Sequence, residues 1–460
     1  MNTRTSIPAA MLLAILGTLA ISLQSRAVDA PPPGQNPAAP RAVQPKPLSI
    51  TVEQGLKYLL AQQHESGGWG QGGGWRQQVG AGGNASGRVE GDNVNDPSDL
   101  GNTCIATLAL IRAGSTPQGG PHANHVAQAV KLICDYVERS DNDSLYVTDV
   151  RDTQLQSKIG RYVDTFLAGL VLSELKGKMP ADGSDQRLIA ALDKTVRKIE
   201  KNQREDGNFA GNTGWASVLS QAVCSKFINR AAQAQVVVKS EVLNRDFYSS
   251  VAALDRGAAP AASVSGRVAA APVAGAAPAA SAAASAPAEG APTDAGVSLY
   301  FIASNASRIA DQNNTAVVQA EKAKEVLKSS SATAEEKDRA RSELGRIDEV
   351  RGAQQSAVRD ITRQLDDKGF VAGFGNNGGE EFLSYMNISE LLVVQGGPEW
   401  EKWDQSMAAN LKRVQNQDGS WSGQHCITGR TFCTAAALLT LMADRAPVPL
   451  AAKINNQQAR

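Results

Sequence analysis

Three copies of one short motif decide the fold of this chain: Gln63-His-Glu-Ser-Gly-Gly-Trp69, Gln203-Arg-Glu-Asp-Gly-Asn-Phe209 and Gln415-Asn-Gln-Asp-Gly-Ser-Trp421. Each copy follows an amphipathic helical pattern. Glycine readily adopts the left-handed conformation that ends a helix, and the glutamine amide can bond the backbone groups left unpaired there. The aromatic ring can then cover the helix end. We therefore predict a structural role for Gln63, Gly67, Trp69, Gln203, Gly207, Phe209, Gln415, Gly419 and Trp421, with a degenerate fourth copy at 366–370.

Helical periodicity extends through most of the chain around these motifs. Apolar residues recur at i, i+3, i+4 and i+7, whereas the best strand candidate is the short run Val236–Val238. Some helical segments are amphipathic and charged, as at 52–63, and others are small and apolar on nearly every side, as at 102–113. The first kind suits an outer shell and the second a buried inner layer.

The two kinds of helix alternate six times along the chain. Outer helices are predicted to begin near residues 52, 125, 187, 238, 310 and 401, and inner helices near 101, 159, 213, 296, 380 and 430. Repeated helix pairs bury a continuous core by packing against their neighbours. The sequence therefore predicts an all-α fold, in the form of an α6/α6 toroid of inner and outer helices.

The motifs resemble the repeat of the squalene-cyclase and prenyltransferase superfamily. The resemblance is carried by V-E-Q-G-L-K-Y-L-L-A-Q-Q-H-E-S-G-G-W-G from Val52 and N-L-K-R-V-Q-N-Q-D-G-S-W-S-G from Asn410, and it covers roughly 50–230 and 365–445. It implies an α/α toroid of the terpenoid-cyclase type. It does not imply one activity, because toroids of this kind also include thioester proteins and vitamin carriers.

The N-terminus predicts a signal peptide over residues 1–27. Arg4 supplies the positive charge, and Ser25-Arg-Ala27 fits a cleavage site. The apolar run Met11–Leu23 is shorter than the roughly 20 residues that a spanning helix needs. We therefore expect export to the periplasm or the cell exterior, with no spanning helix after cleavage. The alternative is a permanent membrane anchor.

Two segments of biased composition divide the rest of the chain. Residues 28–48 form a Pro-rich linker, which we expect to be extended. Residues 257–294 are nearly all Ala, Pro, Ser and Gly and lack the large apolar side chains that offset chain entropy, so we predict disorder there. The toroid is then expected in two parts, 49–256 and 295–447, with a tail at 448–460.

One outer element is longer than the others. Residues 314–365 carry two charged helical runs that are separated by Ser329-Ser-Ser-Ala-Thr333. Thr333 and Glu336 have the spacing of a capping box, which begins a helix. These features predict a projecting helical hairpin that binds a protein partner, or alternatively one that is solvated and has no partner.

Charge and cysteine content limit the functions open to this chain. The 46 basic and 46 acidic side chains balance, so there is no electrostatic footprint for nucleic acid. Of the five cysteines, Cys134 and Cys224 are expected to be buried apolar residues. A zinc site is not favoured, although closure of the ring could bring together the candidate ligands Cys104, His425, Cys426 and Cys433, with Asp99 nearby. A disulfide among Cys104, Cys426 and Cys433 is the alternative.

Catalytic residues are hard to identify. The D-x-D-D acid motif of the cyclases is absent, aromatic residues make up only 5% of the chain, and no cysteine lies in a thioester setting. The candidate acids are Asp99, Asp164 and Glu380, at the predicted starts of inner helices. The alternative is that they cap these helices and pair with arginines. Other polar residues at these starts are Asp96, Arg161, Glu381 and Arg430, and His122 and His125 begin an outer helix.

Two functions follow from these features. We expect a non-catalytic binding or scaffold protein that takes a hydrophobic ligand, or a protein partner on the hairpin, and needs no cofactor. The alternative is an enzyme, either a cyclase-like or transferase-like protein acting on an isoprenoid, or a saccharide-active α/α barrel.

Overall fold

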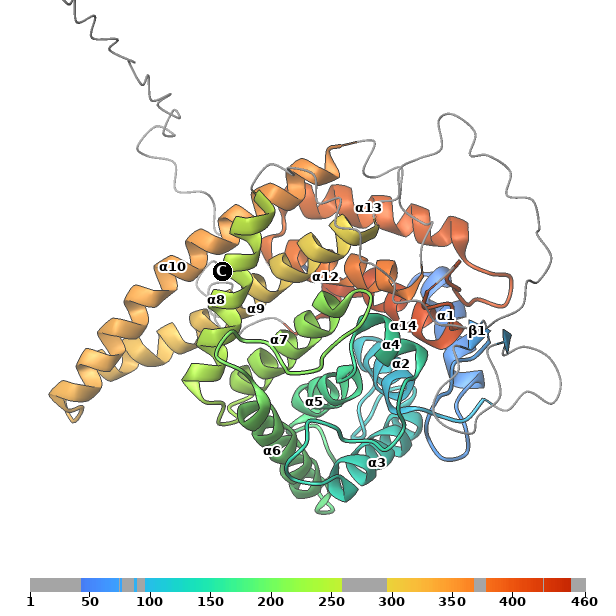
Figure 1. Cartoon of the computed structure of the whole chain (residues 1–460), viewed down its shortest axis with the longest axis horizontal. Coiled ribbons are helices and arrows are strands. Elements are labelled where there is room, and N and C mark those ends of the chain that lie inside the picture. The colour runs from blue at the N-terminus through green and yellow to red at the C-terminus, as the bar shows by residue number, and fades with distance from the viewer. Residues whose placement is uncertain are drawn as a thin grey trace, which may run out of the picture. The chain divides into compact units, whose positions relative to one another are not determined.

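Helices form nearly all of the secondary structure in a computed structural model of the chain (Figure 1). The structure describes residues 43–73, 75–76, 87–88, 96–258, 296–367, 378–424 and 426–447, all within the compact unit Pro40–Arg460. The strands there are β1 (Trp75–Arg76) and β2 (Gly87–Arg88), which pair antiparallel. The all-α prediction is confirmed. The predicted signal peptide, most of the linker, nearly all of the 257–294 insert and the tail lie outside the described residues.

Six of the helices bury most of their surface and correspond to the predicted inner layer. They are α2 (Leu100–Arg112), α5 (Val163–Leu175), α7 (Ser217–Gln233), α9 (Gly296–Lys328, mostly buried over 299–316), α12 (Gly379–Gln395) and α14 (Arg430–Leu441). Alanine, threonine and serine are frequent among their buried residues, which lets neighbouring helices approach closely.

Six other helices bury one face and expose the other. They are α1 (Ile50–Ala61), α3 (Ala123–Arg139), α6 (Ser184–Asn202), α8 (Ser240–Ala258), α10 (Ala334–Leu365) and α13 (Gly397–Val414). Two short helices complete the described elements, α4 (Gln154–Ile159) and the 3₁₀ turn η1 (Ala443–Arg445). In the described part of the chain, no helix combines the length and apolar character needed to cross a bilayer.

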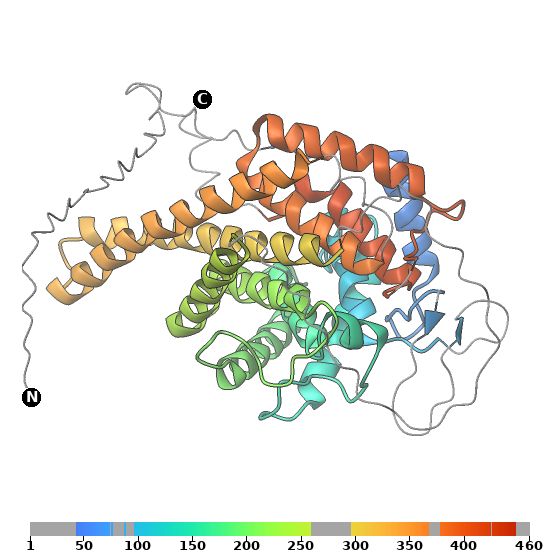
Figure 2. The same ribbon diagram turned by 45° about the horizontal axis from the view of Figure 1, so that its top comes forward.

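The inner helices contact one another in a cyclic order, and α7 also contacts α12. Helix α2 contacts α5, α5 contacts α7, α7 contacts α9, α9 contacts α12, α12 contacts α14, and α14 contacts α2. These contacts therefore form a closed cycle of six helices. Helices α3, α6, α8 and α13 pack on α2, α5, α7 and α12, while α1 packs between α14 and α2 (Figures 1 and 2).

All predicted helix starts lie within four residues of an observed start except the one near residue 310, which is wrong. Helix α9 continues through this position from Gly296 to Lys328. The polar run Asp311-Gln-Asn-Asn314 resembles a solvated helix start, but these side chains are buried. The interior supplies partners for Asp311 and Gln312, so the helix does not need to end there. The run Val236–Val238 is likewise not a strand but joins α7 to α8.

Helices α9 and α10 form the hairpin that the sequence predicts. Their joined ends, yellow and orange in Figure 2, project away from the other helices. The capping box is confirmed, because Thr333 Oγ1 accepts from Glu336 N at 3.2 Å and Glu336 Oε2 accepts from Thr333 N at 2.8 Å. The first helix of the hairpin differs from the prediction in being the outward continuation of an inner helix.

Candidate functional site

The glycine of each motif lies against the backbone of an outer helix. All three glycines have a positive φ, of 88° at Gly67, 77° at Gly207 and 88° at Gly419. A Cβ atom would collide with a helix carbonyl oxygen: that of Gln128 in α3 at 2.7 Å, that of Arg245 in α8 at 2.6 Å, or that of Gln54 in α1 at 2.5 Å. Glycine is therefore needed both for its conformation and for the close approach.

The glutamine of each motif also bonds to an outer helix, and not to the helix end that precedes it. Gln63 Nε2 donates to Gly67 O at 2.8 Å and to His125 O, in the first turn of α3, at 3.0 Å. Gln203 Nε2 donates to Val242 O in α8 at 3.3 Å. Gln415 Nε2 donates to Thr51 O in α1 at 2.9 Å. Each motif thus joins one outer helix to the next, and the last motif joins α13 back to α1.

The tryptophans join the outer helices to the inner ones. Trp69 and Trp421 are fully buried. Trp69 Nε1 donates to Leu59 O in α1 at 2.7 Å, and its backbone N–H donates to Thr103 Oγ1 in α2 at 3.0 Å. Trp421 bonds in the same way to α13 and α14. Phe209, which has no ring donor, instead packs on Phe166 with ring centroids 5.2 Å apart. The predicted structural role of these residues is therefore supported by their contacts.

The three candidate acids lie at the starts of inner helices. Asp99 is the N-cap of α2, and its Oδ1 accepts from Asn102 N at 2.8 Å. Asp164 lies in the first turn of α5, where its Oδ2 accepts from Gln156 Nε2 at 2.5 Å. Glu380 lies in the first turn of α12, where its Oε2 accepts from Ile427 N at 3.2 Å. Helix N-termini favour negative charge, so capping accounts for Asp99.

The structure brings two of these acids together. A Cβ atom on Gly101 would lie 2.6 Å from Asp164 Oδ1 and 3.6 Å from Asp99 Oδ1, so both carboxyls face this glycine. Glu380 lies elsewhere, near Cys426 and Cys433. Asp164 Oδ1 and Glu380 Oε1 are buried and have no hydrogen-bond partner within the described part of the chain.

Burial changes the protonation of all three acids. Desolvation raises the pKa of Asp99 to about 6, of Asp164 to about 7 and of Glu380 to about 7. The charge of Asp99 raises the pKa of Asp164 further. Asp164 and Glu380 are therefore about half protonated at neutral pH, unlike carboxyls on a protein surface, whereas Asp99 is mostly ionised.

The remaining polar residues at these helix starts have structural contacts. Asp96 accepts from the backbone N–H groups of Gln71 and Gly72, at 3.0 and 2.7 Å. Arg430 pairs with Asp418 at 3.2 Å. His125 Nδ1 hydrogen-bonds Gln63 Oε1, and Tyr385 donates to Glu381. Arg161 is exposed, and His122 is an N-cap residue whose side chain makes no capping bond.

The candidate zinc ligands do not gather at one place. Cys104 is near Asp99 and Asp164, whereas Cys426 and Cys433 are near Glu380. No group of three or more potential ligands is placed to hold a metal ion in the described part of the chain, and His425 lies outside it. The structure describes all five cysteines, and none of them forms a disulfide bond; Cys433 Sγ contacts Ile427 O at 3.5 Å.

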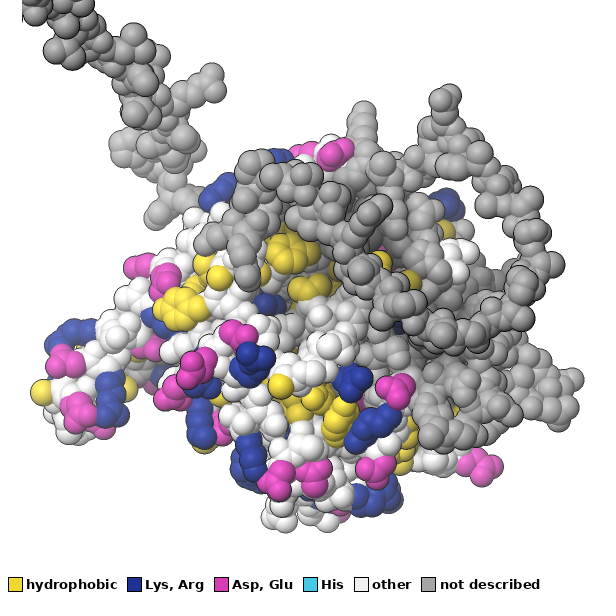
Figure 3. All heavy atoms as spheres, viewed as in Figure 1, with side chains coloured by type: hydrophobic (Ala, Val, Ile, Leu, Met, Phe, Trp, Pro, Cys, Tyr) yellow, Lys and Arg dark blue, Asp and Glu magenta, His cyan; other side chains and the backbone are white. Residues whose placement is uncertain are grey.

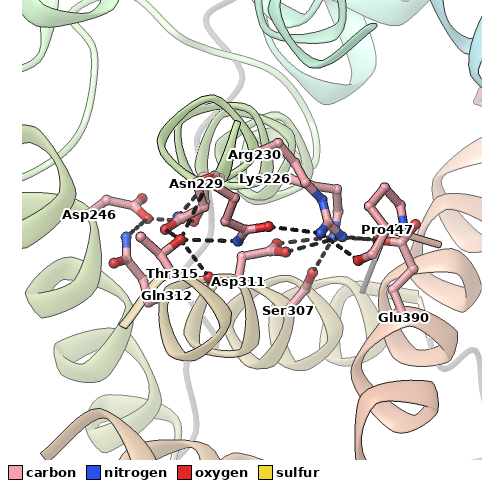
Figure 4. A network of polar contacts seen from close by, with 12 residues as sticks. Lys226, Asn229, Arg230, Asp246, Ser307, Asp311, Gln312, Thr315, Glu390 and Pro447 are labelled. Carbon is pink, nitrogen blue, oxygen red and sulfur yellow. Dashed lines mark hydrogen bonds and ion pairs between the residues drawn. The ribbon is translucent and has the colours of Figure 1, made fainter. Parts of the chain in front are cut away.

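A cluster of buried charges lies between the inner helices and was not predicted (Figure 4). Its six members are at most 5% exposed. They come from five helices: Arg112 of α2, Glu174 of α5, Lys226 and Arg230 of α7, Asp311 of α9 and Glu390 of α12. We call these six residues the central charge cluster.

Glu390 occupies the middle of the central charge cluster. It pairs with Lys226 at 2.7 Å, with Arg112 at 3.2 Å and with Arg230 at 3.8 Å. Lys226 also pairs with Asp311 at 3.0 Å, and Arg112 Nη2 donates to Glu174 at 2.8 Å. Three cations face three carboxylates, so the cluster is neutral overall.

The same contacts keep Glu390 ionised. Burial alone would raise the pKa of Glu390, but Lys226, Arg112 and Arg230 together hold it well below its ordinary range. Burial would lower the pKa of Lys226, but Asp311 and Glu390 raise it. The sequence signal for these residues was a charge within an otherwise apolar helix, such as Arg112 at the end of α2 and Glu174 near the end of α5.

Replacing Glu380 by glutamine is expected to reduce the pH dependence of stability. A carboxyl whose pKa is higher in the folded state stabilises the fold below the unfolded value of 4.5, and this contribution is lost as the pH rises to about 7. Glu380→Gln should therefore remove about 2 kcal/mol of the fall in unfolding free energy between pH 5 and 8. Urea unfolding at both pH values measures it, with exposed Glu399→Gln as control. An unchanged pH dependence in Glu380→Gln would contradict the prediction.

Comparisons of this chain with protein-family models, with curated proteins and with solved structures found no match.

Proposed function

We propose that the chain is an exported, non-catalytic binding or scaffold protein, built as an α6/α6 toroid of the type that its repeats resemble. The cyclic order of contacts among the inner helices supports the toroid. The bond from Gln415 to α1 supports it as well, because it joins the last outer helix to the first.

The central charge cluster is the observation that carries the non-catalytic assignment. Side chains of five inner helices meet inside the ring and pair with one another. A buried carboxylate that is held ionised by three cations is a poor general acid, and a paired buried cation is not available to a ligand. The interior of the ring therefore acts as a polar core that orients the helices.

The hairpin of α9 and α10 is the proposed contact surface for a protein partner. A groove of about 630 Å³ lies along its outer end. Small side chains such as Ala323 and Ala340 line this groove together with Val326. Charged side chains of both signs gather at the end of the hairpin (Figure 3). A groove of this composition suits a helix with a narrow apolar face and a charged border.

An enzyme remains the second candidate, because of the acids at the helix starts. Asp164 and Glu380 are buried, are partly protonated near neutral pH, and each has one oxygen without a partner. A general acid in an isoprenoid-cyclising or saccharide-cleaving enzyme needs these properties.

Native mass spectrometry combined with a turnover assay tests the proposal. The protein lacking residues 1–27 is expected to have the mass of its polypeptide alone, and to leave squalene, farnesyl diphosphate and cello- or malto-oligosaccharides unchanged. Any product formed from these substrates would overturn the non-catalytic assignment. A retained lipid would favour the binding role over the scaffold role, and one bound zinc ion would contradict the expectation that the protein needs no cofactor. Asp164→Asn and Glu380→Gln serve as matched controls, because loss of the product in either variant would identify the acid.

A further inference from the structure

Helix α4 covers the starts of α2 and α5. It has six residues, of which Leu155, Gln156 and Ile159 are fully or almost fully buried. Gln156 bonds to Asp164 at the start of α5. Leu155 lies over the start of α2, because its Cδ1 would be 2.8 Å from a Cβ atom on Gly101. The carboxyls of Asp99 and Asp164 therefore lie beneath α4.

Left-handed residues flank α4 on both sides. Asp152 has a φ of 56° and Gly160 has a φ of 126°. A side chain at Gly160 would collide with Ser220 Oγ at 2.3 Å, so the chain at the end of α4 approaches α7 closely. On its other side, Gln154 exchanges two long hydrogen bonds with Thr428, of 3.2 and 3.3 Å. Opening of α4 must therefore break these bonds to Thr428 and the 2.7 Å bond from Ala216 N to Lys158 O.

The surroundings of Asp164 disfavour its negative charge on balance, because burial outweighs the favourable contributions of Gln156 and Arg151. Asp164 is 2% exposed, and among the residues that the structure describes Gln156 of α4 is the one hydrogen-bond donor to its carboxyl. Asp99 of α2 faces it with a like charge. The other titratable groups around it are Cys104 of α2, Tyr136 of α3 and, in the loop before α4, Arg151.

Arg151 does not neutralise this carboxyl. Its guanidinium lies 3.7 Å from the ring centroid of Tyr146 and donates to Thr148 O. The thiol of Cys104 and the phenol of Tyr136 are uncharged at neutral pH, because burial raises the pKa of both. Ionised Asp164 would therefore gain solvation if α4 moved away.

We propose that α4 is a pH-responsive cover, which is closed while Asp164 is protonated and opens when Asp164 ionises. Opening exposes the carboxyls of Asp99 and Asp164, at the starts of α2 and α5, to solvent. The direction follows from linkage: the closed state has the higher proton affinity, so the cover is most stable at low pH and loses stability as the pH rises.

Hydrogen exchange of the α4 amides between pH 5 and 8.5, corrected for intrinsic exchange rates, tests the cover. Since burial raises the pKa of Asp164 from 3.8 to about 7, the opening constant should rise up to about pH 7 and then level off. The expected rise is roughly tenfold per pH unit. In Asp164→Asn, the opening constant should stay at the low-pH value throughout.

Asp152→Asn is the matched control. Asp152 is exposed and adjoins α4, and asparagine also accepts its left-handed conformation, so this variant should keep the wild-type pH dependence. A pH-independent opening constant in the wild-type protein would overturn the cover, even if Asp164→Asn failed to fold. So would an unchanged pH dependence in Asp164→Asn, or equal loss of protection in α3 and α6. The exchange experiment needs no ligand, so its outcome is independent of the mass and turnover tests.

Discussion

Replacing Glu390 by glutamine is expected to lower the free energy of unfolding by about 3–5 kcal/mol, as for other buried ion pairs that lose one partner. Glutamine has nearly the same shape but no charge. The cluster would then hold Arg112, Lys226 and Arg230 against only Glu174 and Asp311, which leaves one uncompensated positive charge inside the protein. Urea unfolding at pH 7 measures the loss.

Two further variants show whether charge imbalance is the cause. Exposed Glu335, which pairs with Arg339 in α10, is the matched control, and Glu335→Gln should leave stability unchanged within error. The double variant Lys226→Met with Glu390→Met restores neutrality and should be more stable than Glu390→Gln. A double variant that is less stable than the single one would indicate that the specific contacts matter more than the balance of charge.

Replacing Gly419 by alanine is expected to destabilise the protein by about 2–4 kcal/mol, because a left-handed alanine is strained and its Cβ atom also meets backbone. That atom would lie 2.5 Å from Gln54 O in α1. Gln415 bonds to the same helix through Thr51 O, so the contact between α13 and α1 would have to widen. Urea unfolding measures the effect.

Gly114→Ala separates the two contributions. Gly114 has a φ of 94°, similar to that of Gly419, but nothing lies within 4 Å of the position its Cβ would take. The free energy of unfolding of this variant should fall by about 1 kcal/mol, which is the cost of the left-handed conformation alone. If Gly419→Ala were no more destabilising than Gly114→Ala, the contact between the last motif and α1 would not be tight.

The position of the helices was predictable because it depends on local pattern. The start of α12 follows from the apolar residues that recur at helical spacing after Gly379, such as Phe382 and Met386, and the start of α10 follows from the capping box of Thr333 and Glu336. The prediction of a helix start near residue 310 was wrong because it depended on burial, which is not a local property. Asp311 looks like a surface residue in the sequence, but it is buried because Lys226 lies opposite it on another helix.

The candidate site was predictable only in part. Asp99, Asp164 and Glu380 were identified from their places at helix starts, and Asp99 does cap its helix. The sequence does not show that the carboxyls of Asp164 and Asp99 both face Gly101, while Glu380 lies apart from them. It also does not show that α4 covers the first two, because six residues are too few for a periodic pattern to define their partner.

By itself, the sequence determined the helical class, the alternation of inner and outer helices, and the structural role of the glycines and tryptophans in the motifs that follow the outer ones. Helical periodicity and left-handed glycines act over a few residues, so they can be read along the chain. Only the tertiary structure decided where each motif binds and which charges meet. Gln415 bonds to the first outer helix, and Arg112 pairs with Glu390, 278 positions away. The physical reason is that burial and charge pairing depend on distance in space, which the packing of the inner helices sets.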